Sequence, residues 1–249
     1  RALSHINPKN VIAAAPSHFA KNVLKDFLGD SYRVTTVASL LGLKVSYDDE
    51  GKQIMIPNGR PDPPIVYYSI ILIDEGSMLD DETAHLILNF VRKGNKKLIV
   101  LGDYCQLPPV AQDHDSLFFK QIAAELTIPM RFTGAIYNLT KYVRDEIHKM
   151  RDGLIPTLNV INAKTDRVSI VEELGSGYIF LNNIKTVLSA AIRRFQKGES
   201  VDYVRILAYR NKTIAKINHH IRTGLYGKNS AQFEIGELLI SEGGYMSQN

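Results

Sequence analysis

The feature that most constrains the fold is a pair of short aliphatic runs that each end in polar residues. The first run, Ile70 to Ile73, leads directly into Asp74 and Glu75. The second run, Leu98 to Leu101, begins about one helix length later and leads through Gly-Asp-Tyr-Cys to Gln106. Continuous aliphatic runs are typical of strands that are covered on both faces in parallel sheets, and such sheets bind ligands at their carboxyl ends. The sequence therefore predicts an α/β protein with its chemistry at the carboxyl edge of a parallel sheet.

Two neighbouring carboxylates and an amide at one sheet edge suit nucleotide hydrolysis. One carboxylate can hold a metal ion while its neighbour handles the attacking water, and an amide can hydrogen-bond both a phosphate oxygen and that water. Acidic residues also end strands simply as solvated turn residues, and for Asp74 and Glu75 taken alone that alternative stays open.

The residues around both strand ends carry a family resemblance. Asp-Glu-Gly-Ser-Met at 74–78 and Gly-Asp-Tyr-Cys-Gln-Leu-Pro-Pro-Val at 102–110 resemble motifs II and III of superfamily 1 helicases. The Leu-Pro-Pro-Val ending is similar to the 5′-to-3′ branch, which contains RecD-like enzymes, the phage helicase Dda and the Pif family. The resemblance implies a RecA-like P-loop NTPase motor that uses ATP and Mg²⁺. In such a motor Asp74 would hold Mg²⁺, Glu75 would activate water and Gln106 would sense the γ-phosphate.

The pattern restarts near Gly134, where we predict a strand over Ala135 to Leu139 and then a basic amphipathic helix. We place a domain boundary here, with a partial first RecA-like domain at 1–134 and a partial second one at 135–249. Leu139 to Arg144 resembles motif IV, whose arginine reaches the γ-phosphate from the second domain. A bidentate guanidinium suits charge that is spread over phosphoryl oxygens. We therefore predict that Arg144 stabilises the transition state, the alternative being an ordinary surface charge.

A phosphate-gripping loop of the form Gly-x-x-x-x-Gly-Lys-Ser/Thr does not occur in the sequence. The Gly-Lys pairs at 51–52 and 227–228 lack the following hydroxyl residue. The resemblance therefore implies a fragment of a longer motor, in which Arg1 to Ile6 end the helix that follows such a loop, and in which the later helicase motifs are also missing.

Two segments resemble parts of the family that contact single-stranded DNA. A predicted strand at 11–15 leads through Pro16, Ser17 and His18 into a helix, and this resembles motif Ia, usually Ala-Pro-Thr-His. A helix N-terminus suits a phosphate group, although Ser17 can also be a plain N-cap. A second segment resembles Thr-Ile-His-Ser-Leu-Leu with Ala38 in place of the histidine, so that only Thr36 and Ser39 are implied as contacts. As an alternative, Thr36 simply caps the short helix that follows.

Residues 44 to 56 alternate around an acidic turn that ends in Gly51, which predicts a β-hairpin within an insert at about 44–66. In RecD-like and Dda-type enzymes a hairpin in this place splits the duplex. Its tip here is acidic, with only Tyr47 as a nearby aromatic residue. A hairpin that merely decorates the sheet is the alternative.

The remaining periodic segments predict ordinary elements. Asp80 to Gly94 predicts a helix, and Asn211 is expected to cap another helix that runs through Ile221. Strands are predicted at 201–208 and from 233 to 240. Arg210, between the first of these strands and its helix, is a candidate DNA contact. Residues 113–115, Asp-His-Asp, are metal-ligand types without companion spacing, which favours a solvated loop.

Composition sets the broad class. The 249 residues are 45% hydrophobic and 22% charged, which indicates a globular protein, and a single cysteine excludes an internal disulfide. No apolar stretch approaches the roughly 20 residues of a membrane span. Residues 139 to 222 hold 15 Lys and Arg against 8 Asp and Glu, which suits either a phosphate backbone or ordinary solvated helices.

We therefore expect a cytoplasmic, monomeric DNA helicase that acts on single-stranded DNA and on single/double-strand junctions, in repair, replication or recombination. A non-catalytic nucleic-acid-binding domain derived from such a motor and an RNA translocase are the alternatives.

Overall fold

A computed structural model shows the chain as two compact units, residues 1–131 with 141–156 and residues 132–140 with 157–249. The structure describes residues 7–47, 53–106, 108–109, 112, 114–120, 122–128, 130, 133–151, 168–171, 176–181, 183–201 and 203–237. The predicted boundary between residues 134 and 135 stays a prediction. The predicted helical end at Arg1 to Ile6 lies outside the described residues.

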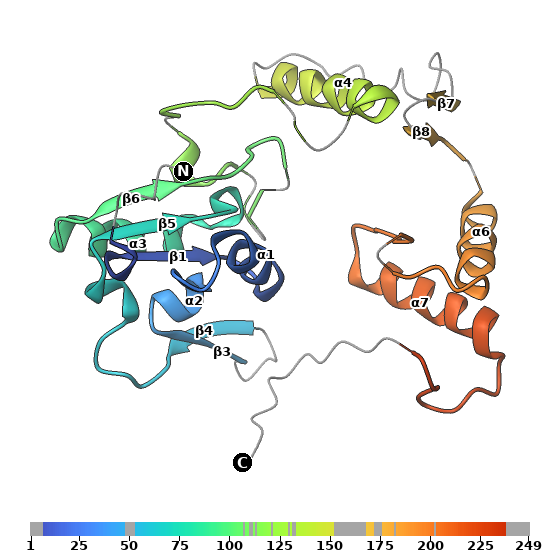
Figure 1. The fold of residues 1–249 in the computed structure, drawn as a ribbon, viewed down its shortest axis with the longest axis horizontal. Helices are drawn as coiled ribbons and strands as arrows, with labels where there is room; N and C mark the ends of the chain where they lie inside the picture. The colour runs from blue at the N-terminus through green and yellow to red at the C-terminus, as the bar shows by residue number, and fades with distance from the viewer. Residues whose placement is uncertain are drawn as a thin grey trace. The chain divides into compact units, whose positions relative to one another are not determined.

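The first unit is built on a parallel sheet of four strands in the order β2-β1-β5-β6 (Figure 1). The strands are β1 (Val11–Ala15), β2 (Arg33–Thr36), β5 (Ile70–Ile73) and β6 (Lys97–Val100). The chain steps outward from β1 to β2 on one side and from β5 to β6 on the other. The winding therefore reverses between β1 and β5, and ligands bind such sheets outside the carboxyl ends at this reversal.

Helices cover both faces of the sheet. Leu24 of α1 (His18–Leu28) packs with Ala13 and Ala15 of β1 on one face. On the other face, Ile12 and Ile71 pack with residues of α2 (Val37–Leu40) and α3 (Asp81–Lys93). Every residue of β1 is buried, because successive side chains point to opposite, covered faces. The predicted α/β fold class is confirmed.

Side-chain caps fix where these helices begin. The Ser17 hydroxyl accepts from the Ala20 N–H at 3.1 Å, and the Thr36 hydroxyl accepts from the Ser39 N–H at 3.2 Å. An Asp80 carboxylate oxygen accepts from the Thr83 N–H at 2.8 Å. Each bond satisfies a backbone donor that the first helical turn leaves unpaired. The predicted starts of all three helices are confirmed.

Short elements connect the sheet to its surroundings. The 3₁₀ turns are η1 (Pro8–Asn10), η2 (Pro64–Tyr67), η3 (Gly76–Met78) and η4 (Leu117–Phe119). Strands β3 (Leu43–Tyr47) and β4 (Gln53–Pro57) pair antiparallel and confirm the predicted hairpin. The acidic tip of the hairpin lies outside the described residues.

The strand predicted at Ala135 to Leu139 is wrong. These residues form the first turns of helix α4 (Gly134–Arg151). A run of five residues, four of them apolar, fits a strand and a buried helical segment equally well. The deciding pattern extends further, since Leu139, Val143 and Ile147 follow at helical spacing.

The second unit contains the antiparallel pair β7 (Val168–Val171) and β8 (Ser176–Ile179), and the helices α6 (Ile184–Gln196) and α7 (Asn211–Tyr226). The described residues within 201–208 and 233–240 form no strand, so these two predictions are wrong for them. Asn211 is the first residue of α7 rather than its N-cap, because Arg210 holds the cap position, without a side-chain cap bond.

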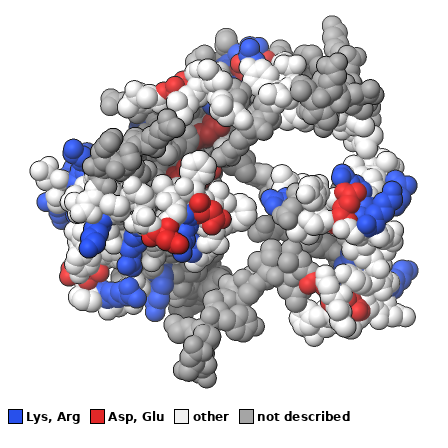
Figure 2. All heavy atoms as spheres, viewed as in Figure 1, with Lys and Arg blue, Asp and Glu red and all other residues white. Residues whose placement is uncertain are grey.

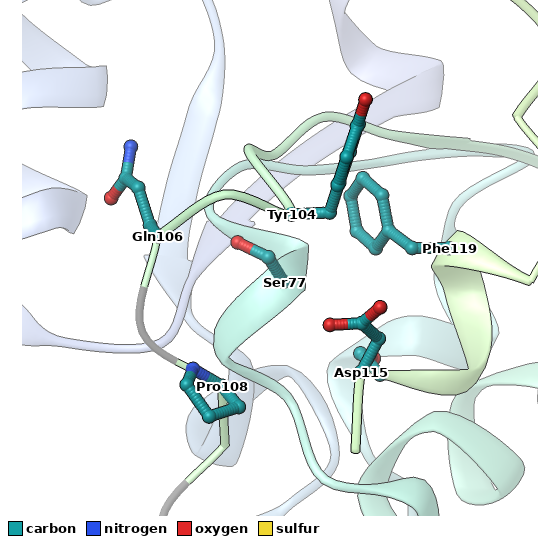
Figure 3. A pocket seen from close by; sticks show the side chains of 7 residues that line it. Ser77, Tyr104, Gln106, Pro108, Asp115 and Phe119 are labelled. Carbon is teal, nitrogen blue, oxygen red and sulfur yellow. The ribbon is translucent and has the colours of Figure 1, made fainter. Parts of the chain in front are cut away.

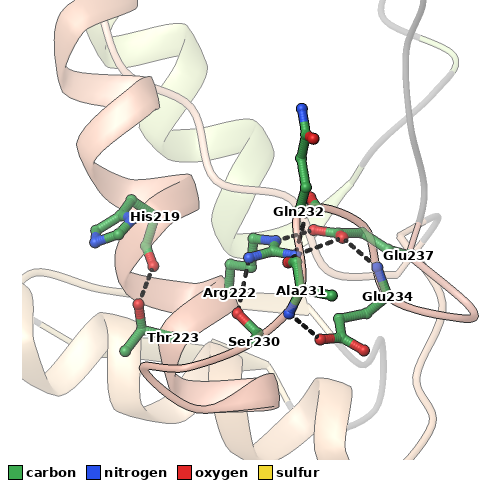
Figure 4. A network of polar contacts seen from close by, with 8 residues as sticks. All are labelled: His219, Arg222, Thr223, Ser230, Ala231, Gln232, Glu234 and Glu237. Carbon is green, nitrogen blue, oxygen red and sulfur yellow. Dashed lines mark hydrogen bonds and ion pairs between the residues drawn. The ribbon is translucent and has the colours of Figure 1, made fainter.

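One arginine holds the turn that follows α7 (Figure 4). The Nε of Arg222 lies 2.6 Å from Oε1 of Glu237, and its Nη1 donates to the Ser230 hydroxyl at 2.8 Å. Glu237 in turn accepts from the Glu234 N–H at 3.2 Å. These bonds satisfy polar groups locally, which explains why residues 233–237 make a turn where sequence predicted a strand.

On the visible face, cationic and anionic side chains are interspersed (Figure 2). None of the described helices is long and apolar enough to cross a membrane.

Candidate nucleotide site

The carboxyl ends of the four parallel strands bring the predicted site residues of the first unit to one edge of the sheet. Ala14 of β1 is in register with Ile73 of β5, and Ala15 with Thr36 of β2. Pro16 to His18 therefore follow β1 at the same edge at which Asp74 and Glu75 follow β5. This edge is the place where the winding of the sheet reverses.

Glu75 has a strained backbone. Its φ of 54° and ψ of 36° lie in the left-handed region, which costs a residue with a side chain roughly 1–2 kcal/mol. The next residue is held in place, because the Gly76 N–H donates to the Leu101 carbonyl at 2.8 Å. Strain of this kind persists only where the surroundings enforce it, and it clusters at functional sites.

Two glycines allow the loops after β5 and β6 to touch. A Cβ on Gly102 would lie 2.9 Å from the Ser77 backbone nitrogen and 2.7 Å from Phe119 Cζ. A Cβ on Gly76 would collide with Val100 Cγ1. The close approach therefore requires glycine at both positions, and it locks the acidic pair to the loop that carries Gln106.

Asp103 shapes the loop that leads to Gln106. Its Oδ1 accepts from the Cys105 N–H, and its backbone carbonyl accepts from the Gln106 N–H, both at 3.0 Å. The Gln106 side chain itself is exposed. The loop is thus folded by Asp103 and leaves the amide of Gln106 on the surface.

Helix α4 packs its Arg144 against this loop. The Nη1 of Arg144 lies 2.8 Å from Oδ2 of Asp103, and its guanidinium lies 5.9 Å from the centre of the Tyr104 ring. His148, one turn later, contacts the edge of Tyr104, and its Nε2 lies 3.9 Å from the Cys105 Sγ. The sequence placed Arg144 in a second domain, whereas the structure places it in the first compact unit.

Asp103 and Arg144 each stabilise the charged form of the other. Burial alone would raise the pKa of Asp103, but the hydrogen bonds from Arg144 and from the Cys105 N–H outweigh it and hold that pKa below its usual value. The hydrogen bond to Asp103 raises the pKa of Arg144. Burial, followed by the negative charge of Glu125, raises the pKa of Tyr104. The pair is therefore fully charged at neutral pH.

A narrow hollow, too tight to admit a water molecule, lies beside this loop (Figure 3). Ser77, Tyr104, Gln106 and Ser116 are among its lining residues. The buried hydroxyls of Ser77 and Ser116 have no hydrogen-bond partner in the described part of the chain. Buried hydroxyls are normally satisfied, so these two are exceptional polar groups beside the loop of Gln106. A complete nucleotide needs a larger space, since ligand pockets measure roughly 300–1,000 Å³.

The chemistry of Asp74 and Glu75 fits Mg²⁺. This ion typically binds one or two carboxylates and takes its other ligands from water and substrate phosphates. The described residues contain no group of three or more His, Cys, Asp or Glu side chains that could hold a metal without a substrate. The acidic pair thus suits a metal that arrives with a nucleotide.

The predicted nucleic-acid contacts differ in exposure. His18 and Ser39 are exposed at the carboxyl edge, and Arg210 is exposed in the second unit. The hydroxyls of Ser17 and Thr36 cap helices, and Thr36 is only 8% exposed. The side chains of His18, Ser39 and Arg210 are therefore better placed to reach a strand than the two capping hydroxyls.

Sequence reasoning did not identify four contributors to the site. Asp103 lies inside the motif III string, so its acidic side chain next to a glycine was a visible signal. His148 and Ser116 offered no signal, because their neighbours at the site are distant in sequence. Ser77 lies inside the motif II string, but its burial follows from the contact between two loops.

A parallel sheet covered on both faces, with an acidic pair at its winding reversal, places the first unit among the doubly wound α/β proteins, which bind ligands at this reversal. The sequence profile of the AAA domain family matches residues 1–173, and the chain belongs to this family. No curated protein matches the chain significantly.

Three solved helicase structures illustrate what the chain is similar to. Pif1 from Bacteroides sp in complex with ADP-AlF4 is 21% identical, with a TM-score of 0.41 over 67% of this chain and 42% of that chain. Bacteroides Pif1 bound to ssDNA is 18% identical, with a TM-score of 0.38 over 75% of this chain and 47% of that one. The Pif1 helicase from Candida albicans is 19% identical, with a TM-score of 0.38 over 87% of this chain and 52% of that chain. The chain matches at most 52% of the length of these three structures.

Proposed function

We propose that this chain is part of an ATP-driven helicase motor that moves 5′-to-3′ on single-stranded DNA. The observation that carries the proposal is the pair of Asp74 and the strained Glu75 at the winding reversal of the sheet, where the next residue, Gly76, is hydrogen-bonded to Leu101 before the loop of Gln106. Membership of the AAA domain family supports the use of ATP. The resemblance of residues 74–78 and 102–110 to helicase motifs II and III supports the motor and its polarity.

Each residue of the edge has a distinct task in this proposal. Asp74 would hold the Mg²⁺ that accompanies ATP, an ion that would supply positive charge to the phosphates. Glu75 accepts the proton of the attacking water, and the Gln106 amide hydrogen-bonds a γ-phosphate oxygen and orients that water.

Arg144 stabilises the charge of the transition state in this proposal. Its guanidinium is paired with Asp103, three residues before Gln106, so it must exchange a carboxylate for phosphoryl oxygens. The exchange would replace one contact from Nη1 with a planar fork that fits two phosphoryl oxygens. Asp103 would then hold the arginine beside the site until nucleotide binds.

The DNA partners in this proposal are single strands and single/double-strand junctions. Pro16, Ser17, His18, Thr36 and Ser39 would contact the strand from the first unit, and Arg210 from the second. The hairpin of β3 and β4 would split the duplex.

The catalytic part is tested by Glu75→Gln in a parent protein that supplies the phosphate loop. Mg-ATP binding should be retained, while DNA-stimulated turnover should fall by roughly 10²-fold or more, as loss of a general base does. Glu82→Gln, at an exposed position in the first turn of α3, is the matched control and should be normal. Unchanged turnover in Glu75→Gln would reassign the base.

The same assay separates the alternatives. Stronger stimulation by a uridine RNA than by a thymidine DNA oligonucleotide would indicate an RNA translocase. Binding of single strands without any ATP turnover in that parent would indicate a non-catalytic binding domain. The present chain contains no phosphate loop, so we expect it to show negligible turnover by itself.

The hairpin has its own test. Replacing residues 48–51 with a tight two-residue turn should reduce duplex unwinding and leave single-strand-stimulated ATPase nearly intact. A parallel loss of both activities would mean that the hairpin supports the fold, and unchanged unwinding would mean that it only decorates the sheet.

A further inference from the structure

A second cavity, of about 380 Å³, lies at the opposite, amino edge of the same sheet. Arg33, which contributes to its lining, is the first residue of β2, and Tyr68 precedes β5 by one residue. Arg60, Asp62 and Tyr67 are further polar residues of the lining. Two prolines of the same loop also line the cavity. The volume falls in the range of small-molecule sites, whereas the hollow beside Gln106 does not admit a water molecule.

The loop that forms this cavity is fixed by packing and hydrogen bonds to the rest of the first unit. Ile65 of η2 is fully buried, and a Cβ on Gly42 would lie 3.1 Å from Pro63 Cβ. The Nζ of Lys96 donates to the carbonyls of Val66 at 2.8 Å and of Tyr68 at 2.7 Å. Prolines in the same loop restrict its backbone further. A ligand would therefore meet a site that needs little ordering on binding.

The lining combines groups that recognise phosphate and an aromatic base. Within the described part of the chain, neither Arg33 nor Arg60 forms an ion pair. A guanidinium fits phosphate oxygens bidentately. The Tyr67 ring, whose residue is 69% exposed, offers a face on which a base can stack.

The acidic side chain of the cavity fits the same ligand. The Tyr67 hydroxyl donates to Oδ2 of Asp62 at 3.3 Å, which orients the ring. The remaining acceptor capacity of this carboxylate suits the N–H groups on the edge of a base. The lining holds one carboxylate and two arginines that form no ion pair with other described residues, so the cavity is cationic, as an anionic ligand requires.

We propose that this cavity binds one nucleotide unit, with its base against Tyr67 and its phosphate against Arg33 and Arg60. The unit belongs either to a single strand or to a free mononucleotide, and the two share this chemistry. The proposal does not rest on the motor function, because the site is formed by different residues at the other edge of the sheet from Asp74 and Glu75.

Photocrosslinking of the full chain with a single-stranded thymidine oligonucleotide that carries 5-iodouracil tests the proposal. Peptide mapping should find the crosslink on the segment that contains Tyr67 and Tyr68. The double substitution Arg33→Ala/Arg60→Ala should lower this yield by roughly 10-fold, and added salt should lower it in the unmodified chain, since phosphate contacts are screened. Arg92→Ala, an exposed arginine on α3 away from the lining, should leave the yield unchanged.

Competition with thymidine monophosphate identifies the source of the ligand. Suppression of the crosslink at concentrations near that of the oligonucleotide would assign the cavity to a free mononucleotide, and resistance to this competitor would assign it to a strand. Circular dichroism of the Arg33→Ala/Arg60→Ala variant should match that of the unmodified chain, which controls for misfolding. A crosslink found only elsewhere, or a yield insensitive to both salt and the double substitution, would overturn the proposal. Because Glu75→Gln leaves this cavity intact, failure here is separable from failure of the motor proposal.

Discussion

Two segments that the sequence predicts as apolar strands have different structures in the two units. Ile70 to Ile73 forms strand β5, in which Ile71 and Ile73 are fully buried between neighbouring strands and helices. Residues 203–208 of the second unit form no strand, and Leu207 there is 89% exposed. Hydrophobic composition alone therefore does not make a strand, because the backbone also needs partners on its edges and the side chains need cover. The first unit meets both conditions. It also holds all four residues proposed for chemistry, which are Asp74, Glu75, Gln106 and Arg144.

The largest effect that would sharpen this comparison is expected from Arg144→Ala in the parent protein. If the edge of the first unit includes its own transition-state arginine, kcat should fall by roughly 10³-fold with little change in ATP binding. Arg144→Lys should rescue poorly, because an ammonium restores the charge without the planar fork. Single-turnover hydrolysis with saturating single-stranded DNA measures both variants.

Lys141→Ala, an exposed position on the same helix, is the matched control for this measurement. A near-normal rate in Arg144→Ala would leave Arg144 as a structural partner of Asp103. Another residue would then have to supply the catalytic positive charge. The first unit would no longer hold all four of the groups proposed for chemistry.

A smaller effect is expected from shortening one aliphatic side chain in each run. Ile73→Ala should lower the free energy of unfolding by about 2–5 kcal/mol, because it leaves a cavity in a fully buried position. Leu207→Ala should change it by no more than about 0.5 kcal/mol. Urea unfolding of the chain, followed by circular dichroism, measures both. Equal destabilisation by the two substitutions would show that residues 203–208 are covered in solution.

The same contrast explains how much of the fold could be predicted from the sequence. The runs before Asp74 and Gly102 predicted two parallel strands correctly, because each is short, aliphatic and followed by turn residues. The helix starts at Ser17 and Asp80 were predictable because capping is a local interaction. The run at Ala135 was misread because five residues do not separate the periods of strand and helix.

The site was predictable only where a motif carried it. Asp74, Glu75 and Gln106 stand in strings with a recognisable order, and parallel strands necessarily bring their carboxyl ends to one edge. The ion pair of Asp103 with Arg144 joins residues 41 positions apart, and no local pattern announces it. The cavity at Arg33 and Tyr67 depends on how a proline-rich loop folds back on the sheet, which periodicity does not describe.

The smallest expected effect is the pH dependence that this ion pair gives to the first unit. The folded structure lowers the pKa of Asp103, so the folded state binds its proton less readily than the unfolded chain. The stabilisation is therefore complete above the ordinary aspartate pKa and is lost as the pH falls through the lowered value. Because the side chains are 38% and 30% exposed, solvent screening limits the contribution to about 1 kcal/mol or less.

Asp103→Asn isolates this contribution. The stability difference between the unmodified chain and Asp103→Asn should be largest near neutral pH and should shrink through the acidic range, as measured by urea unfolding at a series of pH values. Asp30→Asn is the matched control, since Asp30 is 98% exposed and lies 3.7 Å from Lys25, and it should give no comparable change. A difference that stays constant with pH would mean that Asp103 stabilises the loop through its hydrogen bond to the Cys105 N–H, which an asparagine oxygen only partly replaces, rather than through its charge. In that case hydrogen bonds rather than charge would hold the edge of the first unit, and Arg144 would leave Asp103 for a phosphate at little electrostatic cost.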